Sequence, residues 1–201
     1  MFSFPEDYEQ GWTLGDEITK DGIGLHTGGK SKVLIKPTEL PGFHFSFSEE
    51  SNKVFSIDIS QVKHTPLCTT LDINGKKIST VEHLFASLIG VGMTHVHIEI
   101  TGNEIPLLDG SAIDWIKEIE KVGMVNSITP PNPRPELTSP ICVNKGESVI
   151  FALPSKILRL IGLIDFPYGA IGQQMFSIEL TPKNFVKEIA PARTFGFLDQ
   201  L

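Results

Sequence analysis

The sequence of 201 residues predicts an α+β fold, because a helical pattern is followed directly by a strand pattern. Between positions 80 and 90, five apolar residues recur at the i, i+3, i+4, i+7 and i+8 spacing of an amphipathic helix. These residues are Val81, Leu84, Phe85, Leu88 and Ile89. Between 95 and 100, apolar and polar residues alternate instead, which predicts a half-buried strand. The same unit therefore contains both a sheet and helices.

The remaining elements follow from shorter patterns. Alternating or β-branched runs predict strands, and apolar residues at helical spacing predict helices. We expect further strands at 32–36, 43–47, 54–62, 148–153, 158–166 and 175–180, a helix at 112–122 and a short helical turn at 183–189. Gly123 supplies the stop signal for the helix, and Pro191 ends the helical turn.

A proline-rich stretch divides the chain. Residues 126–140 contain five prolines and few apolar residues, which is typical of a linker. We therefore predict a first α+β domain over 1–125, a linker over 126–140 and a second, partial domain over 141–201. The second domain has almost no helix to cover its sheet, so apolar residues such as Leu160 and Phe176 lack a second layer. This domain is expected to be truncated.

Composition excludes several classes of function. The net charge of −7 and the lack of a basic stripe argue against nucleic acid as a partner. No apolar run approaches the roughly 18 residues that span a bilayer, so an integral membrane protein is not expected. The first ten residues resemble neither a signal peptide nor a transit peptide. Two distant cysteines, Cys68 and Cys142, fit a reducing cytoplasm.

The start of the predicted helix at 80–90 carries the candidate chemistry. Ser79 and Glu82 have the spacing of a capping box, which alone would explain Glu82. At about 100° per residue, His83 lies opposite the apolar stripe, together with Ser87 and Gly90. This small, nearly uncharged back face indicates that another segment packs against it or that a ligand approaches it. A capped helix with a half-buried imidazole and a catalytic pair, Glu82 with His83, both remain open.

Five segments in order resemble the family of zinc-dependent UDP-3-O-acyl-N-acetylglucosamine deacetylases of lipid A synthesis, over its amino-terminal two thirds. The helix start, Thr80-Val81-Glu82-His83-Leu84, is similar to the family's TVEHL motif. The other four are Gly22-Ile23-Gly24-Leu25-His26-Thr27-Gly28, Leu67-Cys68-Thr69, Glu104-Ile105-Pro106-Leu107-Leu108-Asp109-Gly110-Ser111-Ala112 and Ala192-Arg193-Thr194-Phe195-Gly196-Phe197. Each motif is weak alone, since glycine turns and helix caps are common. Their shared order makes the resemblance specific.

The resemblance implies two similar two-layer α+β domains with the active site between their helix layers. It also implies a zinc ion that activates a water and polarises the acetamide carbonyl of a UDP-sugar lipid. By this resemblance, Glu82 is the general base and His83 is one zinc ligand. Thr194 donates a hydrogen bond to the developing oxyanion, and Phe195 lines the substrate site.

The family's remaining catalytic residues have no match in these 201 residues. Two zinc ligands of an H-x-x-x-D segment and a histidine that serves as general acid are missing, and one imidazole cannot hold zinc. We therefore expect the chain to be an incomplete deacetylase, inactive alone, that binds zinc only if a carboxy-terminal chain supplies those ligands. The alternative is a catalytically dead remnant that acts as a binding or regulatory subunit. The expected location is the cytoplasm, or an organelle in a plant or alga.

Five other residues carry polar or reactive groups. His95, His97 and Glu99 share one face of a predicted strand, where an H-x-H metal site competes with an ordinary polar strand face, and the latter is favoured. Asp109 is expected to cap the helix that begins near Ala112. Cys68 is interpreted as a small buried residue rather than a nucleophile.

Overall fold

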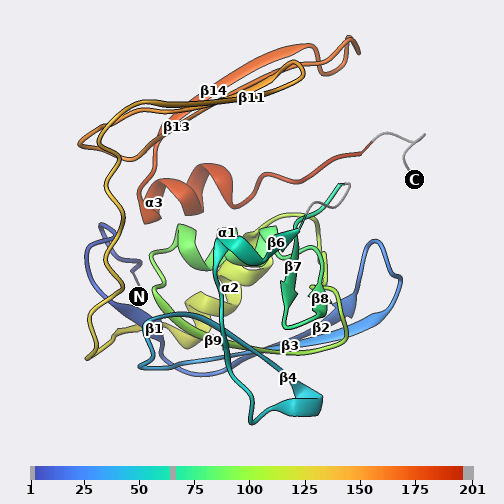
Figure 1. Ribbon diagram of the computed structural model, residues 1–201, viewed down its shortest axis with the longest axis vertical. Coiled ribbons are helices and arrows are strands. Elements are labelled where there is room, and N and C mark those ends of the chain that lie inside the picture. Colours follow the sequence, from blue (N-terminus) through green and yellow to red (C-terminus); the bar gives the residue numbers. More distant parts are fainter. Residues whose placement is uncertain (1–2, 64–66, 197–201) are drawn as a thin grey trace. The chain divides into compact units, whose positions relative to one another are not determined.

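The computed structural model describes residues 3–63 and 67–196, and it divides into two compact units (Figure 1). One unit contains residues up to Asn132 together with the segment from Thr181 onward, and the other contains Pro133–Leu180. The predicted domain boundaries at 125 and 140 stay predictions. Phe197, the last residue of the fifth motif, lies outside the described residues.

A five-stranded sheet forms the base of the first unit, in the order β2-β3-β9-β4-β5. All neighbours are antiparallel except β4 and β9, which run parallel. The bounds are β2 Ile18–Ile23, β3 Lys30–Lys36, β4 Gly42–Phe47, β5 Phe55–Ser56 and β9 His95–Thr101. The predicted strands at 32–36, 43–47 and 95–100 are therefore confirmed.

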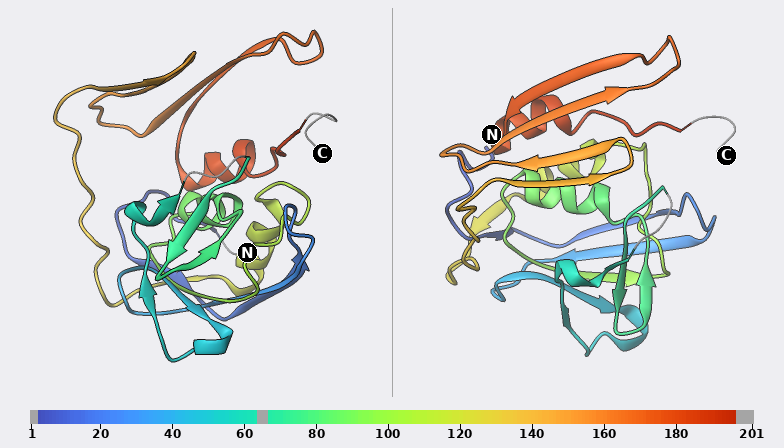
Figure 2. Two further views of the ribbon diagram at one scale, coloured as in Figure 1. Left: turned by 45° about the vertical axis from the view of Figure 1, so that its right-hand side comes forward. Right: turned by 45° about the horizontal axis from the view of Figure 1, so that its top comes forward.

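Two helices cover one face of this sheet, α1 (Glu82–Gly90) and α2 (Ile113–Val122), as the two views of Figure 2 show. Alternate strand residues point toward the helices and are buried, because the side chains of a strand alternate between its two faces. The fully buried layer includes Val33, Ile35, Phe45, Ile98 and Ile100 from the sheet and Leu84, Leu88, Trp115, Ile116 and Ile119 from the helices. The helices predicted at 80–90 and 112–122 are therefore confirmed.

Two smaller sheets complete the first unit. One has the order β6-β7-β8 (Val62–Lys63, Thr70–Ile73 and Lys76–Ile78), and the other pairs β1 (Trp12–Leu14) with β10 (Met124–Asn126). The single strand predicted over 54–62 is wrong. Asp58 accepts a hydrogen bond from the Ser60 amide, while the Gln61 side chain accepts one from the Asp58 amide. This capping box starts a 3-10 helix, Ile59–Gln61, which interrupts the strand.

The small back face of α1 is covered by a later segment, as its composition indicated. Thr181 caps a short helix, α3 (Pro182–Asn184), which continues as a π-helix over Phe185–Ile189. A side chain added at Gly90 would lie 2.5 Å from the Phe185 ring. The absence of a Cβ at Gly90 therefore allows this aromatic ring to pack directly on the helix backbone.

We expect Gly90→Ala to destabilise the chain by about 1–3 kcal/mol, because the added methyl group overlaps the Phe185 ring. Urea denaturation followed by circular dichroism measures the change in the free energy of unfolding. Ala86→Ser is the control, since Ala86 is exposed on the same helix and should change stability by less than about 0.5 kcal/mol. Equal stability of Gly90→Ala and the wild-type chain would contradict this packing.

The second unit consists of two antiparallel hairpins rather than the one sheet expected from the sequence. The strand β11 (Ile141–Lys145) pairs with β12 (Ser148–Ala152), and β13 (Arg159–Asp165) pairs with β14 (Gln173–Glu179). Each pair is local in sequence, and no ladder joins the two pairs. Large apolar side chains on all four strands are exposed, among them Val143, Phe151, Leu163 and Met175.

The part of the chain that the structure describes contains no helix long and apolar enough to cross a membrane.

Candidate functional site

Glu82 and His83 occupy the first turn of α1, and Glu82 is held against the segment before β7. The carboxylate oxygen Oε2 of Glu82 accepts a hydrogen bond of 3.0 Å from the Thr69 amide. The Val81 amide in turn donates to the Thr69 carbonyl oxygen at 3.3 Å. These two bonds join the Leu67-Cys68-Thr69 motif to the TVEHL motif, so two of the five sequence motifs meet at one point.

The predicted capping box is wrong, because Ser79 does not lie at the end of the helix. Val81 is the N-cap residue of α1 and makes no side-chain cap bond. The Ser79 hydroxyl lies 2.9 Å from the Thr70 hydroxyl, and the Ser79 amide donates to the Asn103 carbonyl oxygen. Glu82 is therefore free of the local capping role that would have explained it.

Thr80 enters the helix through an unusual backbone conformation. Its φ of +59° lies in the left-handed region, where a β-branched residue is an outlier. Such a conformation costs about 1–3 kcal/mol and persists only where surrounding contacts hold it. Leu67 and Leu108, in two of the other motifs, also have positive φ, at 62° and 57°. Strain of this kind gathers at functional sites, which supports a functional role for these three segments.

The buried carboxylate of Glu104 holds Thr80 in place. Glu104 is 1% exposed, and its Oε1 accepts hydrogen bonds from the Thr80 hydroxyl at 2.9 Å and the His26 amide at 3.0 Å. Its Oε2 accepts bonds from the Thr27 amide at 2.9 Å and the Thr27 hydroxyl at 2.7 Å. Burial raises the pKa of Glu104, but these four hydrogen bonds outweigh it and lower the pKa to about 2.

The glycine-rich motif forms the turn between β2 and β3 that supplies three of these four donors, two backbone amides and the Thr27 hydroxyl. A side chain at Gly24 would collide with the Glu104 carboxylate, and one at Gly22 would lie 2.6 Å from the Pro106 Cβ. Both glycines therefore permit the close approach of the turn to the Glu104-Ile105-Pro106 segment. The His26 side chain itself is exposed.

His83 is half-buried on the back face of α1 and is backed by Ser87. The Ser87 hydroxyl donates to the His83 carbonyl oxygen at 2.7 Å and approaches the Ala112 carbonyl oxygen at 3.4 Å. The Ala112 amide donates to the Ala190 carbonyl oxygen at 3.0 Å. Ala112 thus lies between the helix that carries His83 and the segment that leads to Thr194.

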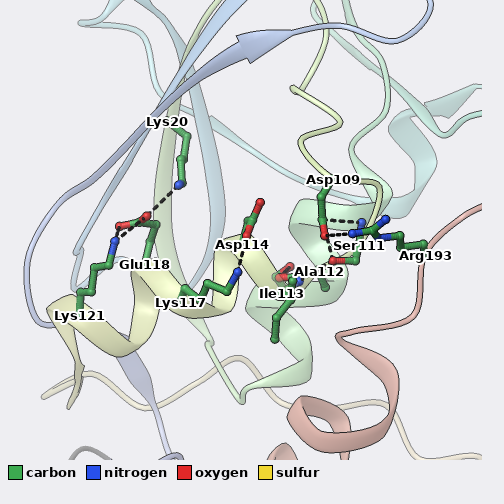
Figure 3. Close-up of polar contacts among 11 residues, drawn as sticks. Lys20, Asp109, Ser111, Ala112, Ile113, Asp114, Lys117, Glu118, Lys121 and Arg193 are labelled. Atoms are coloured by element: carbon green, nitrogen blue, oxygen red, sulfur yellow. Dashed lines mark hydrogen bonds and ion pairs between the residues drawn. The ribbon is translucent and has the colours of Figure 1, made fainter.

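The segment that contains Thr194 contacts the loop before α2. Figure 3 shows the contact between Arg193 of this segment and Asp109 of the loop. The Thr194 amide donates to the Gly110 carbonyl oxygen at 2.9 Å, and Arg193 forms an ion pair of 3.5 Å with Asp109. Phe195 is 57% exposed. The structure therefore brings the fourth and fifth motifs together beside α1.

Asp109 does not cap α2, which corrects the prediction from the sequence. Its Oδ1 accepts bonds from the Ser111 amide at 3.0 Å and the Ser111 hydroxyl at 2.7 Å (Figure 3). The Ser111 hydroxyl then accepts a bond from the Ile113 amide at 3.1 Å. The hydrogen bond from Ser111 is the main cause that lowers the pKa of Asp109, and Arg193 adds to it. Asp109 fixes the loop and leaves its second oxygen for Arg193.

The strand face with His95, His97 and Glu99 shows the polar contacts of an ordinary sheet. His95 is fully buried with Nδ1 at 2.7 Å from the Thr94 hydroxyl, while His97 Nε2 lies 2.8 Å from the Ser46 hydroxyl. Glu99 forms an ion pair with Lys36 at 2.9 Å. The three side chains thus direct polar atoms to different neighbours, which favours the polar-face interpretation.

Within residues 3–63 and 67–196, no three His, Cys, Asp or Glu side chains are grouped as a metal site. The half-buried imidazole of His83 is a suitable nitrogen ligand, but zinc takes three or four protein ligands. The described residues alone therefore do not fit a complete zinc centre. Neither Cys68 nor Cys142 is part of a disulfide.

Comparison with known proteins identifies the family. Residues 12–201 match the family model of LpxC, UDP-3-O-acyl N-acetylglycosamine deacetylase. The chain belongs to this deacetylase family. It is similar to the UDP-3-O-acyl-N-acetylglucosamine deacetylases of Thermosynechococcus vestitus, at 41% identity, and Thermodesulfovibrio yellowstonii, at 38%. In both comparisons the match covers 94% of the chain, but only 66% and 64% of the relative. The chain thus spans about two thirds of the length of these curated deacetylases.

Glu104 is the first residue of the fourth family motif, but the motif does not reveal what this residue does. A charged residue followed by Ile105 and Pro106, facing a turn with two glycines, was the signal available in the sequence. A buried carboxylate needs several donors, and closely spaced glycines allow backbone amides to approach it.

Proposed function

We propose that this chain supplies the general base and one zinc ligand of a deacetylase that acts on UDP-3-O-acyl-N-acetylglucosamine in lipid A synthesis. The observation that carries the proposal is the position of Glu82 and His83. In a chain that belongs to the deacetylase family, they form the first turn of a helix that two further family motifs hold in place. The substrate class comes from the names of the relatives.

Glu82 is suited to accept the proton of an attacking water. One of its carboxylate oxygens accepts the Thr69 amide hydrogen, which fixes the rotamer and leaves the other oxygen for the water. The water oxygen then bonds to the acetamide carbon of the sugar. Cleavage of the carbon–nitrogen bond releases acetate, and the sugar nitrogen takes up a proton to leave as an amine.

Thr194 and Phe195 are proposed to contact the substrate. The Thr194 amide is engaged with Gly110, so its backbone is fixed while the hydroxyl is the group proposed to donate to the oxyanion. Phe195 exposes an aromatic ring next to it and provides apolar surface for the substrate. Two similar α+β domains, with boundaries near 125 and 140, are part of this proposal.

The zinc would supply Lewis acidity and lower the pKa of a bound water. Of its ligands we assign only His83 to this chain, and we propose that the others and the general acid come from polypeptide outside residues 1–201. This agrees with the shorter span of the chain relative to its relatives. Residues 1–201 by themselves should then be inactive. Because neither cysteine is part of a disulfide, a reducing location is favoured, such as the cytoplasm, or an organelle in a plant or alga.

An assay of acetate release from UDP-3-O-acyl-N-acetylglucosamine tests the proposal. It compares residues 1–201 with a completed protein, in which the part of the Thermosynechococcus vestitus deacetylase that the match does not cover is fused after residue 201. We expect no release by the chain alone and zinc-dependent release by the completed protein. A folded, zinc-loaded completed protein without activity would instead favour a catalytically dead binding subunit.

A further inference from the structure

The most unusual group outside the proposed catalytic residues is the Glu104 carboxylate, which joins three separate segments. It receives two hydrogen bonds from backbone amides of the glycine-rich turn and one from each of two threonine hydroxyls. A parallel bridge between Glu104 and Ser79 adds backbone bonds, since the Ile105 amide donates to the Ser79 carbonyl oxygen at 2.9 Å. The residue therefore contacts the entry to α1 through both its backbone and its side chain.

The contact with Thr80 has a direct consequence for the catalytic helix. Thr80 has a left-handed backbone and lies two residues before Glu82 and three before His83. In an ordinary extended or helical conformation at Thr80, the chain would enter α1 in a different direction. Glu82 could then no longer reach the Thr69 amide. The hydroxyl bond from Thr80 to Glu104 supports the one conformation that places Glu82 there.

We propose that Glu104 is a positioning residue for the proposed deacetylase site, which fixes Thr80 in its left-handed conformation and thereby sets the place of Glu82 and His83. The same carboxylate holds the backbone of His26 and Thr27, so the glycine-rich turn and the catalytic helix share one anchor. The assignment of Glu82 and His83 as catalytic rests on the proposed function. The effect of Glu104 on the start of the helix does not.

Amide hydrogen exchange in the 201-residue chain tests this role without metal or substrate. The amides of Thr69 and Val81 report on the start of the helix, because one donates to Glu82 and the other to the Thr69 carbonyl. The amides of the central strand β9 report on global opening. In Glu104→Gln, an NH2 group replaces one carboxylate oxygen. This group faces hydrogen-bond donors and cannot accept hydrogen bonds from them. We expect protection at Thr69 and Val81 to fall by about tenfold more than protection in β9.

Substitutions at Thr80 separate positioning from plain stability. In the Glu104→Gln background, Thr80→Gly should restore protection at Thr69 and Val81, because glycine adopts positive φ without strain. The amides of His26 and Thr27 should stay unprotected, since their acceptor is still altered. Thr80→Ala in the wild-type background keeps the strain and loses the hydroxyl bond, and it should lower protection at Thr69.

A uniform loss of protection in Glu104→Gln, equal at Thr69, Val81 and β9, would overturn the proposal and leave Glu104 as a general stability residue. Failure of Thr80→Gly to restore protection would overturn it as well. Both outcomes are distinct from failure of the proposed function. A site-specific, rescuable loss of protection keeps Glu104 as the determinant of the helix start, even if the completed protein binds no zinc through His83.

Discussion

Replacing Glu104 with glutamine should lower the free energy of unfolding at pH 7 by about 3 kcal/mol, and this difference should disappear in acid. The pKa of Glu104 lies at about 2 in the folded chain, against an ordinary value of 4.5. Because the folded pKa is the lower one, the unfolded chain binds the proton first as the pH falls. The stabilisation is complete above about pH 4.5 and is lost as the pH falls toward 2, at about 1.4 kcal/mol for each unit between the two pKa values.

Urea denaturation of wild-type chain and Glu104→Gln at several pH values between 7 and 3 measures this effect. The informative quantity is the difference between the free energies of unfolding of the two proteins at each pH. The pH dependence of either protein alone also contains contributions from other carboxylates with lowered pKa values, such as Asp58 and Glu118. Glu120→Gln, at an exposed position on α2, serves as the matched control and should follow the wild-type curve. A constant difference between wild type and Glu104→Gln across this range would contradict the buried, ionised carboxylate.

Glu82→Gln should reduce kcat of the completed protein by about 10²- to 10⁴-fold, the usual contribution of a general base. Glutamine keeps an oxygen that can accept the Thr69 amide hydrogen, so the helix start should be unchanged. The zinc content should also stay the same, because Glu82 is not assigned as a ligand. Steady-state acetate release and metal analysis of the same preparation check both points.

A kcat within threefold of wild type in Glu82→Gln would remove Glu82 from the mechanism. Glu120→Gln again provides the control, since its carboxylate is exposed and lies on the other helix. An equal loss of activity in both variants would indicate damage to the fold rather than to the chemistry.

The elements that could be predicted from the sequence are those with a regular spacing of apolar residues. The elements that depend on side-chain hydrogen bonds were missed. The helix α1 and the strand β9 follow from apolar spacing, because burial on one face is what stabilises them. The strand expected over 54–62 failed, since alternation alone does not reveal that Asp58 and Gln61 form a capping box. Local polar bonds there outweigh the weak preference for a strand.

The candidate site was predicted in part, for a similar reason. Glu82 and His83 stand out because the back face of α1 is small and carries one imidazole. The roles of Asp109 and Glu104 depend on residues far away in sequence, Arg193 in one case and the turn with His26 in the other. Spacing within a motif carries no information about such partners. The bond from the Ile113 amide to the Ser111 hydroxyl likewise replaces the cap that was predicted for Asp109.

Zinc binding tests the central claim most directly. Elemental analysis and titration would compare residues 1–201, the completed protein and its His83→Ala variant. The account predicts no stoichiometric zinc on residues 1–201 alone and one zinc per completed protein. It also predicts an affinity lower by about 100-fold or more in His83→Ala, because an incomplete ligand set holds zinc poorly. Tight binding of one zinc by residues 1–201 alone, or full zinc affinity in His83→Ala, would contradict the assignment of His83 as the chain's contribution to a shared metal centre.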